Sequence, residues 1–158
     1  MLINIRQGVF ETNSSSSHSI SYNNDNTEVS RCLREVGTTV VITGGEFGWG
    51  YEELTTPYEK MQYVLTSVIL YENVENRLHE SVLYKWIQEM VLDYSNETLV
   101  LEEVECEFYP YGYIDHQSSD LLTDKDYWRT DNEELFKNGI KDLVFSDKYS
   151  IIIDNDNH

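Results

Sequence analysis

The stretch NSSSSHS, residues 13–19, places four hydroxyl groups beside an imidazole. A serine nucleophile needs a base within hydrogen-bond reach, and the base needs a group that orients it. Adjacent residues rarely face each other in this way, so His18 is not automatically the base for Ser17. His116 follows Asp115 and is the better candidate for a distant base. The pattern predicts a catalytic site of Ser17, His18, Asp115 and His116, with His116 as acid or base and Asp115 orienting it.

The serine run also has a purely structural interpretation. Ser and Asn side chains hydrogen bond to nearby backbone groups, so the run can be a solvated turn without a ligand. The alternative is an ordered loop whose flanking residues Val9, Phe10 and Ile20 anchor both ends in the core. We expect such a loop to pack beside GGEFGWG, residues 44–50, and DHQSS, residues 115–119. On this interpretation the binding residues of the run are Asn13, Ser14, Ser15 and Ser16.

The glycine-rich stretch GGEFGWG lacks the features of a phosphate-binding loop. It contains no Lys and no Ser or Thr, and its spacing is not GxGxxG. It is either a tight turn with Phe47 and Trp49 packed inward, or a pocket wall formed by Glu46 and Trp49. No CxxC, HxxxH or HExxH spacing occurs anywhere in the chain, so we predict neither a metal nor a cofactor.

The elements that would hold these loops follow from hydrophobic spacing. Five strands are predicted, over residues 3–6, 17–22, 38–43, 98–108 and 149–154. Four helices are predicted, over residues 27–36, 56–69, 78–91 and 131–143. Thr27, Thr56 and Asp131 are the predicted N-caps of the first, second and fourth of them. With 158 residues and no visible linker, the chain is expected to be a single domain, residues 1–158, of the α+β or mixed α/β class.

Charge is the most unusual global property of the chain. It has 29 acidic and 11 basic side chains, for a net charge of −18. Such a charge repels nucleic acid and anionic membranes and favours a basic protein partner, although solubility alone would also explain it. In LEEVECEF, residues 101–108, the alternation predicts that Glu103, Glu105 and Glu107 share one face of a strand, as a line of charges resembling phosphates.

Targeting signals and cysteine usage indicate where the protein works. No apolar run reaches the length of a membrane helix, and no secretory signal is visible at the N-terminus. The two cysteines, Cys32 and Cys106, are expected to be reduced, buried thiols in a cytosolic protein.

Three segments together carry a resemblance. The stretch RQGVFETNSSSSHSI, with GGEFGWG and the later IDHQS, resembles a group of uncharacterised proteins from phages and mobile elements of bacteria. The resemblance implies a phage-type protein in the cytoplasm of a bacterial host, and it implies no mechanism. It favours a site made from residues 13–18, Glu46, Asp115 and His116.

Two functional hypotheses follow from these patterns. The first is an acidic inhibitor that binds a basic host or defence protein by imitating nucleic acid, with no direct binding of nucleic acid or membrane. The second is a small hydrolase, nuclease or transferase with a Ser/His/Asp site built by the three polar loops. The first hypothesis places function on acidic surfaces, and the second places it in the serine and histidine loops.

Overall fold

The fold was obtained as a computed structural model, which describes residues 4–6, 16–22, 32–33, 38–74, 77–106, 108–114 and 132–155. The elements are β1 (Asn4–Arg6), β2 (Ser16–Tyr22), β3 (Thr39–Thr43), β4 (Glu46–Phe47), β5 (Glu52–Leu54), α1 (Pro57–Glu72), η1 (Leu78–Glu80), α2 (Val82–Ser95), β6 (Thr98–Glu102), β7 (Tyr113–Ile114), α3 (Glu133–Phe145) and β8 (Tyr149–Asn155). This arrangement confirms the predicted mixture of helices and strands.

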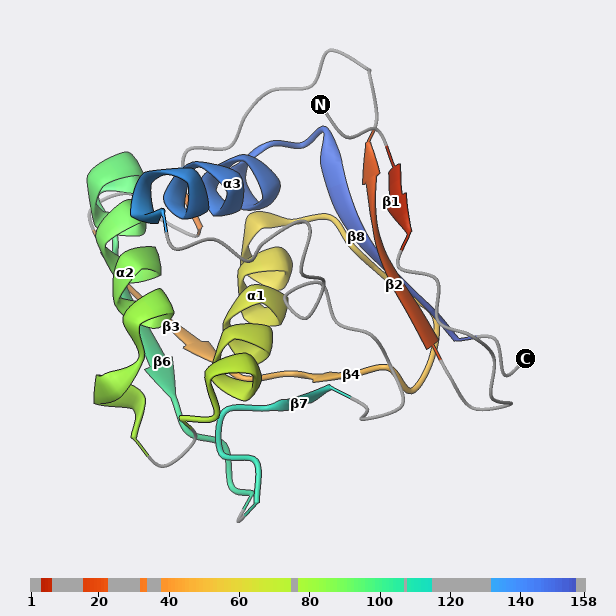
Figure 1. The fold of residues 1–158 in the computed structure, drawn as a ribbon, viewed down its shortest axis with the longest axis horizontal. Helices are drawn as coiled ribbons and strands as arrows, with labels where there is room; N and C mark the ends of the chain where they lie inside the picture. Colours follow the sequence, from red (N-terminus) through yellow and green to blue (C-terminus); the bar gives the residue numbers. More distant parts are fainter. Residues whose placement is uncertain are drawn as a thin grey trace.

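The strands form three separate sheets. The largest has the order β1-β2-β8-β5 and is antiparallel throughout, with Ile20 opposite Ile151 and Leu54 opposite the same residue on the other side. Two smaller sheets are parallel pairs, β3 with β6 and β4 with β7. Figure 1 shows β1, β2 and β8 at one side of the molecule, β3 and β6 at the other, and the β4–β7 pair along the lower edge.

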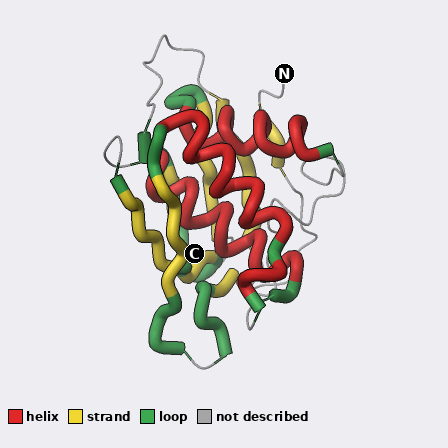
Figure 2. The backbone as a smooth tube through the Cα atoms, turned by 90° about the vertical axis from the view of Figure 1, so that its left-hand side faces the viewer, coloured by secondary structure: helices red, strands yellow, loops and turns green. Residues whose placement is uncertain are grey.

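The helices pack against one another between these sheets. Helix α1 contacts α2, α3, β3 and β7, and α3 also contacts β8. Figure 2 shows the helices lying side by side with strands behind them. One continuous core results, and its fully buried members include Ile42, Met61, Leu65, Val68, Val91, Ile140, Ile151 and Ile153.

Helix α1 begins as the sequence predicts. The Thr56 hydroxyl accepts a hydrogen bond from the backbone N–H of Glu59, and the Glu59 carboxylate accepts one in return from the N–H of Thr56. Pro57 occupies the first turn, where its missing N–H costs nothing. This reciprocal cap fixes the start of the helix that supports the centre of the molecule.

A buried cation joins α1 to the end of α3 and to β8. Lys60 is fully buried, and its Nζ donates to the carbonyl oxygens of Ser146 and Tyr149, each at 2.9 Å. Burial lowers the pKa of Lys60 to about 8, against the opposing influence of Asp147. The ammonium therefore depends on these two carbonyls to replace its lost hydration.

The hydrophobic spacing of the two long helices also predicts a core of Val64, Leu65, Val68, Leu83, Trp86, Ile87 and Met90, and this is largely confirmed. Val64, Leu65, Val68, Ile87 and Met90 are buried, whereas Leu83 and Trp86 are half-buried and pack against the core. The second helix begins four residues later than expected: Leu78 lies in the 3-10 turn η1, and Ser81 caps α2 by accepting from the N–H of Tyr84.

Three other boundaries correct the sequence-based predictions. Cys32 and Leu33 are not helical, and the rest of the helix expected over 27–36 lies outside the described residues. Helix α3 is capped by Asn132 rather than Asp131, because the Asn132 amide oxygen accepts from the N–H of Leu135. The strand predicted over 98–108 ends at Glu102, opposite Thr43, because its parallel partner β3 ends there.

Three short strands were not predicted, namely β4, β5 and β7. The first interrupts GGEFGWG, which was expected to be a loop throughout. Each of the three has at most three residues and gains its hydrogen bonds from a segment far away in the sequence. No helix among the described residues has the length and apolar character needed to span a membrane.

Candidate functional site

The predicted serine and histidine site is only partly within the described residues. Ser16, Ser17 and His18 belong to β2, where they pair with Asn155, Asp154 and Ile153 of β8. These three residues are therefore strand residues. The strand predicted over residues 17–22 is confirmed, and the loop predicted for NSSSSHS is wrong for residues 16–19. The remaining members of that site, Asn13, Ser14, Ser15, Asp115 and His116, lie outside the described residues, so the catalytic grouping stays a prediction.

Three other predicted residues do come together. Glu46, Trp49 and Glu105 line one cavity of about 430 Å³ between β4, β7 and the segment after β6. We call it the β4–β7 cavity. This volume falls within the range of about 300–1,000 Å³ that is typical of ligand sites. Its other side-chain walls come from Val104, Cys106, Tyr109 and Tyr113.

Helix α1 fixes the backbone at the inner end of this cavity. The Thr66 hydroxyl accepts a hydrogen bond from the N–H of Gly45 at 3.1 Å, and it donates to the Gln62 carbonyl at 2.8 Å. The Gln62 side-chain amide in turn donates to the carbonyl of Thr43 at 2.9 Å. The Gly45 carbonyl then accepts from the N–H of Tyr113 at 2.8 Å, which joins the two cavity walls.

Two glycines allow these walls to approach. A Cβ atom at Gly44 would lie 1.9 Å from the carbonyl oxygen of Tyr111, which is far inside van der Waals contact. Gly112 has a φ of 96°, and a Cβ atom there would lie 2.6 Å from the Gly45 carbonyl oxygen. Side chains at these positions would force the two walls apart, so the cavity depends on glycine at both.

An aromatic wall lines one side of the cavity. The rings of Tyr109 and Tyr113 are 4.5 Å apart, and Trp49 stacks on Tyr113 at 6.2 Å with an angle of 30° between the ring planes. Trp49 is nevertheless 63% exposed, and the nearby loop residue Phe108 is 76% exposed. Large apolar side chains that stay this exposed and gather in one place mark interaction sites.

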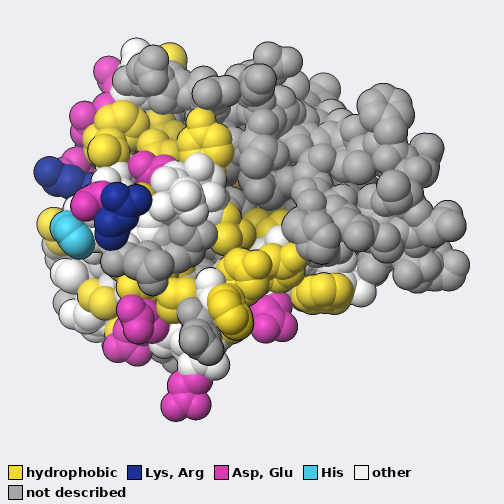
Figure 3. Space-filling view, turned by 60° about the horizontal axis from the view of Figure 1, so that its bottom comes forward, with side chains coloured by type: hydrophobic (Ala, Val, Ile, Leu, Met, Phe, Trp, Pro, Cys, Tyr) yellow, Lys and Arg dark blue, Asp and Glu magenta, His cyan; other side chains and the backbone are white. Residues whose placement is uncertain are grey.

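Carboxylates surround this aromatic wall. Glu46 and Glu105 are exposed, and in the described part of the chain no Lys or Arg forms an ion pair with either. The described residues of the cavity lining include no Lys, Arg or His. Figure 3 shows exposed hydrophobic side chains beside acidic ones on the lower face, while the Lys and Arg side chains in view gather to the left.

Glu103 has a structural contact. Its carboxylate accepts a hydrogen bond from the buried Tyr111 hydroxyl at 3.1 Å. Burial, followed by the contact with Glu103, raises the pKa of Tyr111. The expected row of glutamates on one strand face is wrong for Glu103 and Glu105, because both follow the end of β6. Glu107 lies outside the described residues, so its place in that row stays a prediction.

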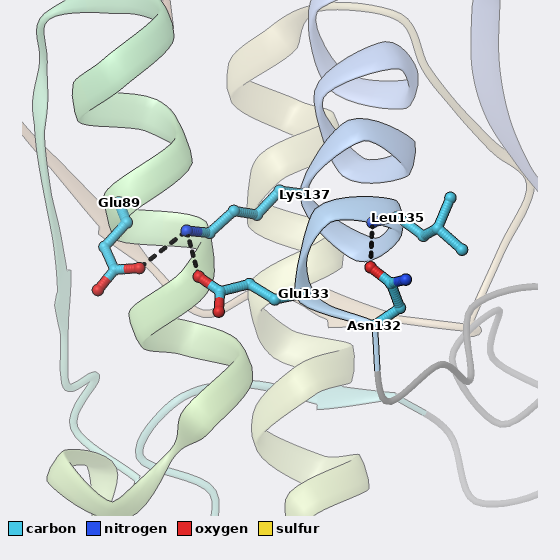
Figure 4. A network of polar contacts seen from close by, with 5 residues as sticks. All are labelled: Glu89, Asn132, Glu133, Leu135 and Lys137. Carbon is cyan, nitrogen blue, oxygen red and sulfur yellow. Dashed lines mark hydrogen bonds and ion pairs between the residues drawn. The ribbon is translucent and has the colours of Figure 1, made fainter.

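A second, larger cleft of about 580 Å³ lies between α2 and α3. We call it the α2–α3 cleft. Lys137 reaches across it and donates to Glu89 at 2.8 Å while pairing with Glu133 of its own helix at 2.6 Å, as Figure 4 shows. These contacts raise the pKa of Lys137, and the bond from Lys137 lowers that of Glu89. Because the Lys137 ammonium is already paired with both carboxylates, the β4–β7 cavity is the better candidate for a ligand.

Sequence reasoning found the acidic residues and Trp49 but missed Tyr109, Tyr113 and Cys106. Cys106 is exposed and Cys32 is half-buried, so the expectation of two buried thiols is wrong. The aromatic density of YPYGY, residues 109–113, was the available signal. Among the described residues, no group of three His, Cys, Asp or Glu side chains is placed to hold a metal ion. Comparison with family models, with curated proteins and with solved structures found no match to this chain.

Proposed function

We propose that this chain is a small acidic protein of phage type that acts in the cytoplasm of a bacterial host, where it binds and inhibits a basic host or defence protein. The observation that carries the proposal is the β4–β7 cavity, where an exposed aromatic wall stands among carboxylates. The phage origin rests on the resemblance of residues 6–20, 44–50 and 114–118.

The physical case for binding combines two features. Aromatic side chains supply most of the energy at protein interfaces, because they bury a large area with little loss of conformational freedom. Exposed carboxylates supply long-range attraction, and a net charge of −18 extends it over the whole molecule. A protein with a basic surface would pack against the aromatic side chains and be attracted by the carboxylates. Nucleic acid would be repelled by the carboxylates.

The test begins with the immobilised protein and a bacterial lysate. Captured proteins are identified and purified, and the affinity and activity of each are then measured directly at two salt concentrations. We expect a basic partner whose affinity weakens as salt rises and whose activity falls as the acidic protein approaches equimolar amounts. A purified partner without a basic surface, or an affinity that ignores salt, would overturn the proposal.

A further inference from the structure

The geometry points to a specific occupant for the β4–β7 cavity: we infer that it receives an arginine side chain from the surface of the basic partner. This inference rests on the proposed function and names the group that the site recognises. The guanidinium would lie against the exposed indole of Trp49, which stacks on Tyr113, and pair with a carboxylate of the same lining.

A cation is favoured by the chemistry of the walls. The faces of Trp and Tyr rings carry negative electrostatic potential, so a cation placed over them is attracted. Glu46 and Glu105 add full negative charges on the same lining. Among the described residues of the lining there is no basic side chain that would repel an incoming cation. An anion would be repelled by the two carboxylates and by the negative faces of the aromatic rings.

Arginine fits this arrangement better than lysine. Its guanidinium is planar, so it stacks on an aromatic face while its edge donates two parallel hydrogen bonds to a carboxylate. Trp49, which is 63% exposed and stacks on Tyr113, presents such a flat surface. The lysine ammonium is a compact, strongly hydrated point charge that cannot stack, so it would lose more hydration for less contact.

The cavity is also prepared before the partner arrives. Hydrogen bonds from Gly45 to Thr66 and from Tyr113 to Gly45 hold both walls in place without a ligand. The approach of the backbone at Gly44 and Gly112 leaves these walls little freedom to separate. A site that is already ordered loses less entropy on binding, which favours recognition of a single side chain.

The experiment uses the full-length protein and small probes followed by NMR. The indole N–H signal of Trp49 is identified by its loss in Trp49→Phe, and Trp86 and Trp128 serve as internal references. Three probes are titrated: N-acetylarginine amide, N-acetyllysine amide and N-acetylcitrulline amide. Citrulline keeps the shape of arginine but lacks its charge, so it separates the effect of charge from that of shape.

Paired charge variants provide the matched control. Glu46→Gln with Glu105→Gln removes two charges at the cavity, and Asp93→Asn with Glu134→Gln removes two exposed charges at the α2–α3 cleft. Both double variants have the same net charge, so long-range attraction changes equally. Any difference between them therefore reports on the β4–β7 cavity itself.

We expect a saturable shift of the Trp49 signal with the arginine probe, a severalfold weaker response with lysine, and none with citrulline. The double variant Glu46→Gln with Glu105→Gln, which we call the cavity pair, should bind the arginine probe about tenfold more weakly. The control variant, Asp93→Asn with Glu134→Gln, should bind it with nearly unchanged affinity. An unmoved Trp49 signal, an equal response to citrulline, or equal losses in the two double variants would each overturn the inference. A basic partner that still binds the cavity pair with native affinity would also overturn it, while leaving the proposed function standing on another surface.

Discussion

The α2–α3 cleft and the β4–β7 cavity contain similar charged groups used in opposite ways. In the cleft, Lys137 lies between Glu89 and Glu133, and these three charges are paired within the fold. In the cavity, Glu46 and Glu105 stand beside exposed aromatic rings. The difference shows that size alone is a poor guide to a binding site here, because the larger cleft already holds these paired charges.

The largest expected difference between the two regions is in the stability that their tryptophans contribute. Trp86 packs against Phe136 at 5.8 Å between α2 and α3, whereas Trp49 lies exposed at the cavity. Trp86→Ala should lower the free energy of unfolding by about 3–5 kcal/mol, near the lower end because the ring is half-buried. Trp49→Ala should cost less than about 1 kcal/mol. Urea denaturation of both variants measures the two values, and a reversed order would contradict the division into a structural and a binding region.

Lys60 extends the comparison to a fully buried charge. The unfolded chain holds its proton with a pKa near 10.5, and the folded chain with a pKa of about 8. Between these values the unfolded state binds more protons, so the native protein gains stability as pH rises. The advantage of native protein over Lys60→Met should therefore grow by on the order of 2–3 kcal/mol across this window.

The check for Lys60 is denaturant unfolding of both proteins over a series of pH values from 8 to 10.5. Only the difference between the two proteins is compared, because tyrosines whose pKa values are raised by burial, such as Tyr84 and Tyr149, contribute to the pH dependence of both proteins. A difference that is flat with pH would mean that the lysine keeps its proton when buried.

Association kinetics test the cavity side of the comparison. Replacing Glu103, Glu105 and Glu107 with Gln should slow association with the basic partner by about tenfold at low salt and leave the fold intact. Glutamine at position 103 keeps an acceptor for the Tyr111 hydroxyl. The control replaces three exposed acids of the helices, Asp93, Glu134 and Asp142, with their amides. Biosensor measurements should show a smaller decrease in the control, and equal decreases would indicate that net charge alone attracts the partner.

The smallest effect is expected at the α2–α3 cleft. Lys137→Met removes both of its ion pairs but retains the aliphatic part of the side chain. The resulting loss of thermal stability should be slight at low salt and smaller still at high salt, because solvent and salt screen such pairs. A large loss that persists in high salt would show that the bridge between the helices is a principal stabilising contact.

Local signals explain what could be predicted from the sequence. The Thr56 cap, Pro57 and the Glu59 carboxylate act within a few residues of one another, so the start of α1 can be predicted from the local sequence. The β-branched run of β3 and the isoleucines of β8 also identify their own conformations. Asp115 and His116 lie outside the described residues, so the predicted catalytic grouping stays a prediction.

Distant pairings explain what could not. The sequence GluGluLeu of β5 has weak strand propensity and becomes a strand because β8 lies beside it. The alternation around Glu105 is typical of a strand, but β3 ends at Thr43, so that segment has no continuation of β3 to pair with. Tyr113 enters the cavity only because β7 pairs with β4, and no local pattern announces a pairing between segments so far apart in the sequence.

The position of β8 between β2 and β5 has a consequence for the order in which the protein can fold. A ribosome releases β1, β2 and β5 long before it releases the strand that joins them. Until then, β2 and β5 present open edges, and Ile20 lacks the neighbour that covers it at Ile151. Such late, long-range closure slows folding and extends the period in which a nascent chain can aggregate. Production of this protein should therefore benefit from slow synthesis and from chaperones that hold the early strands apart.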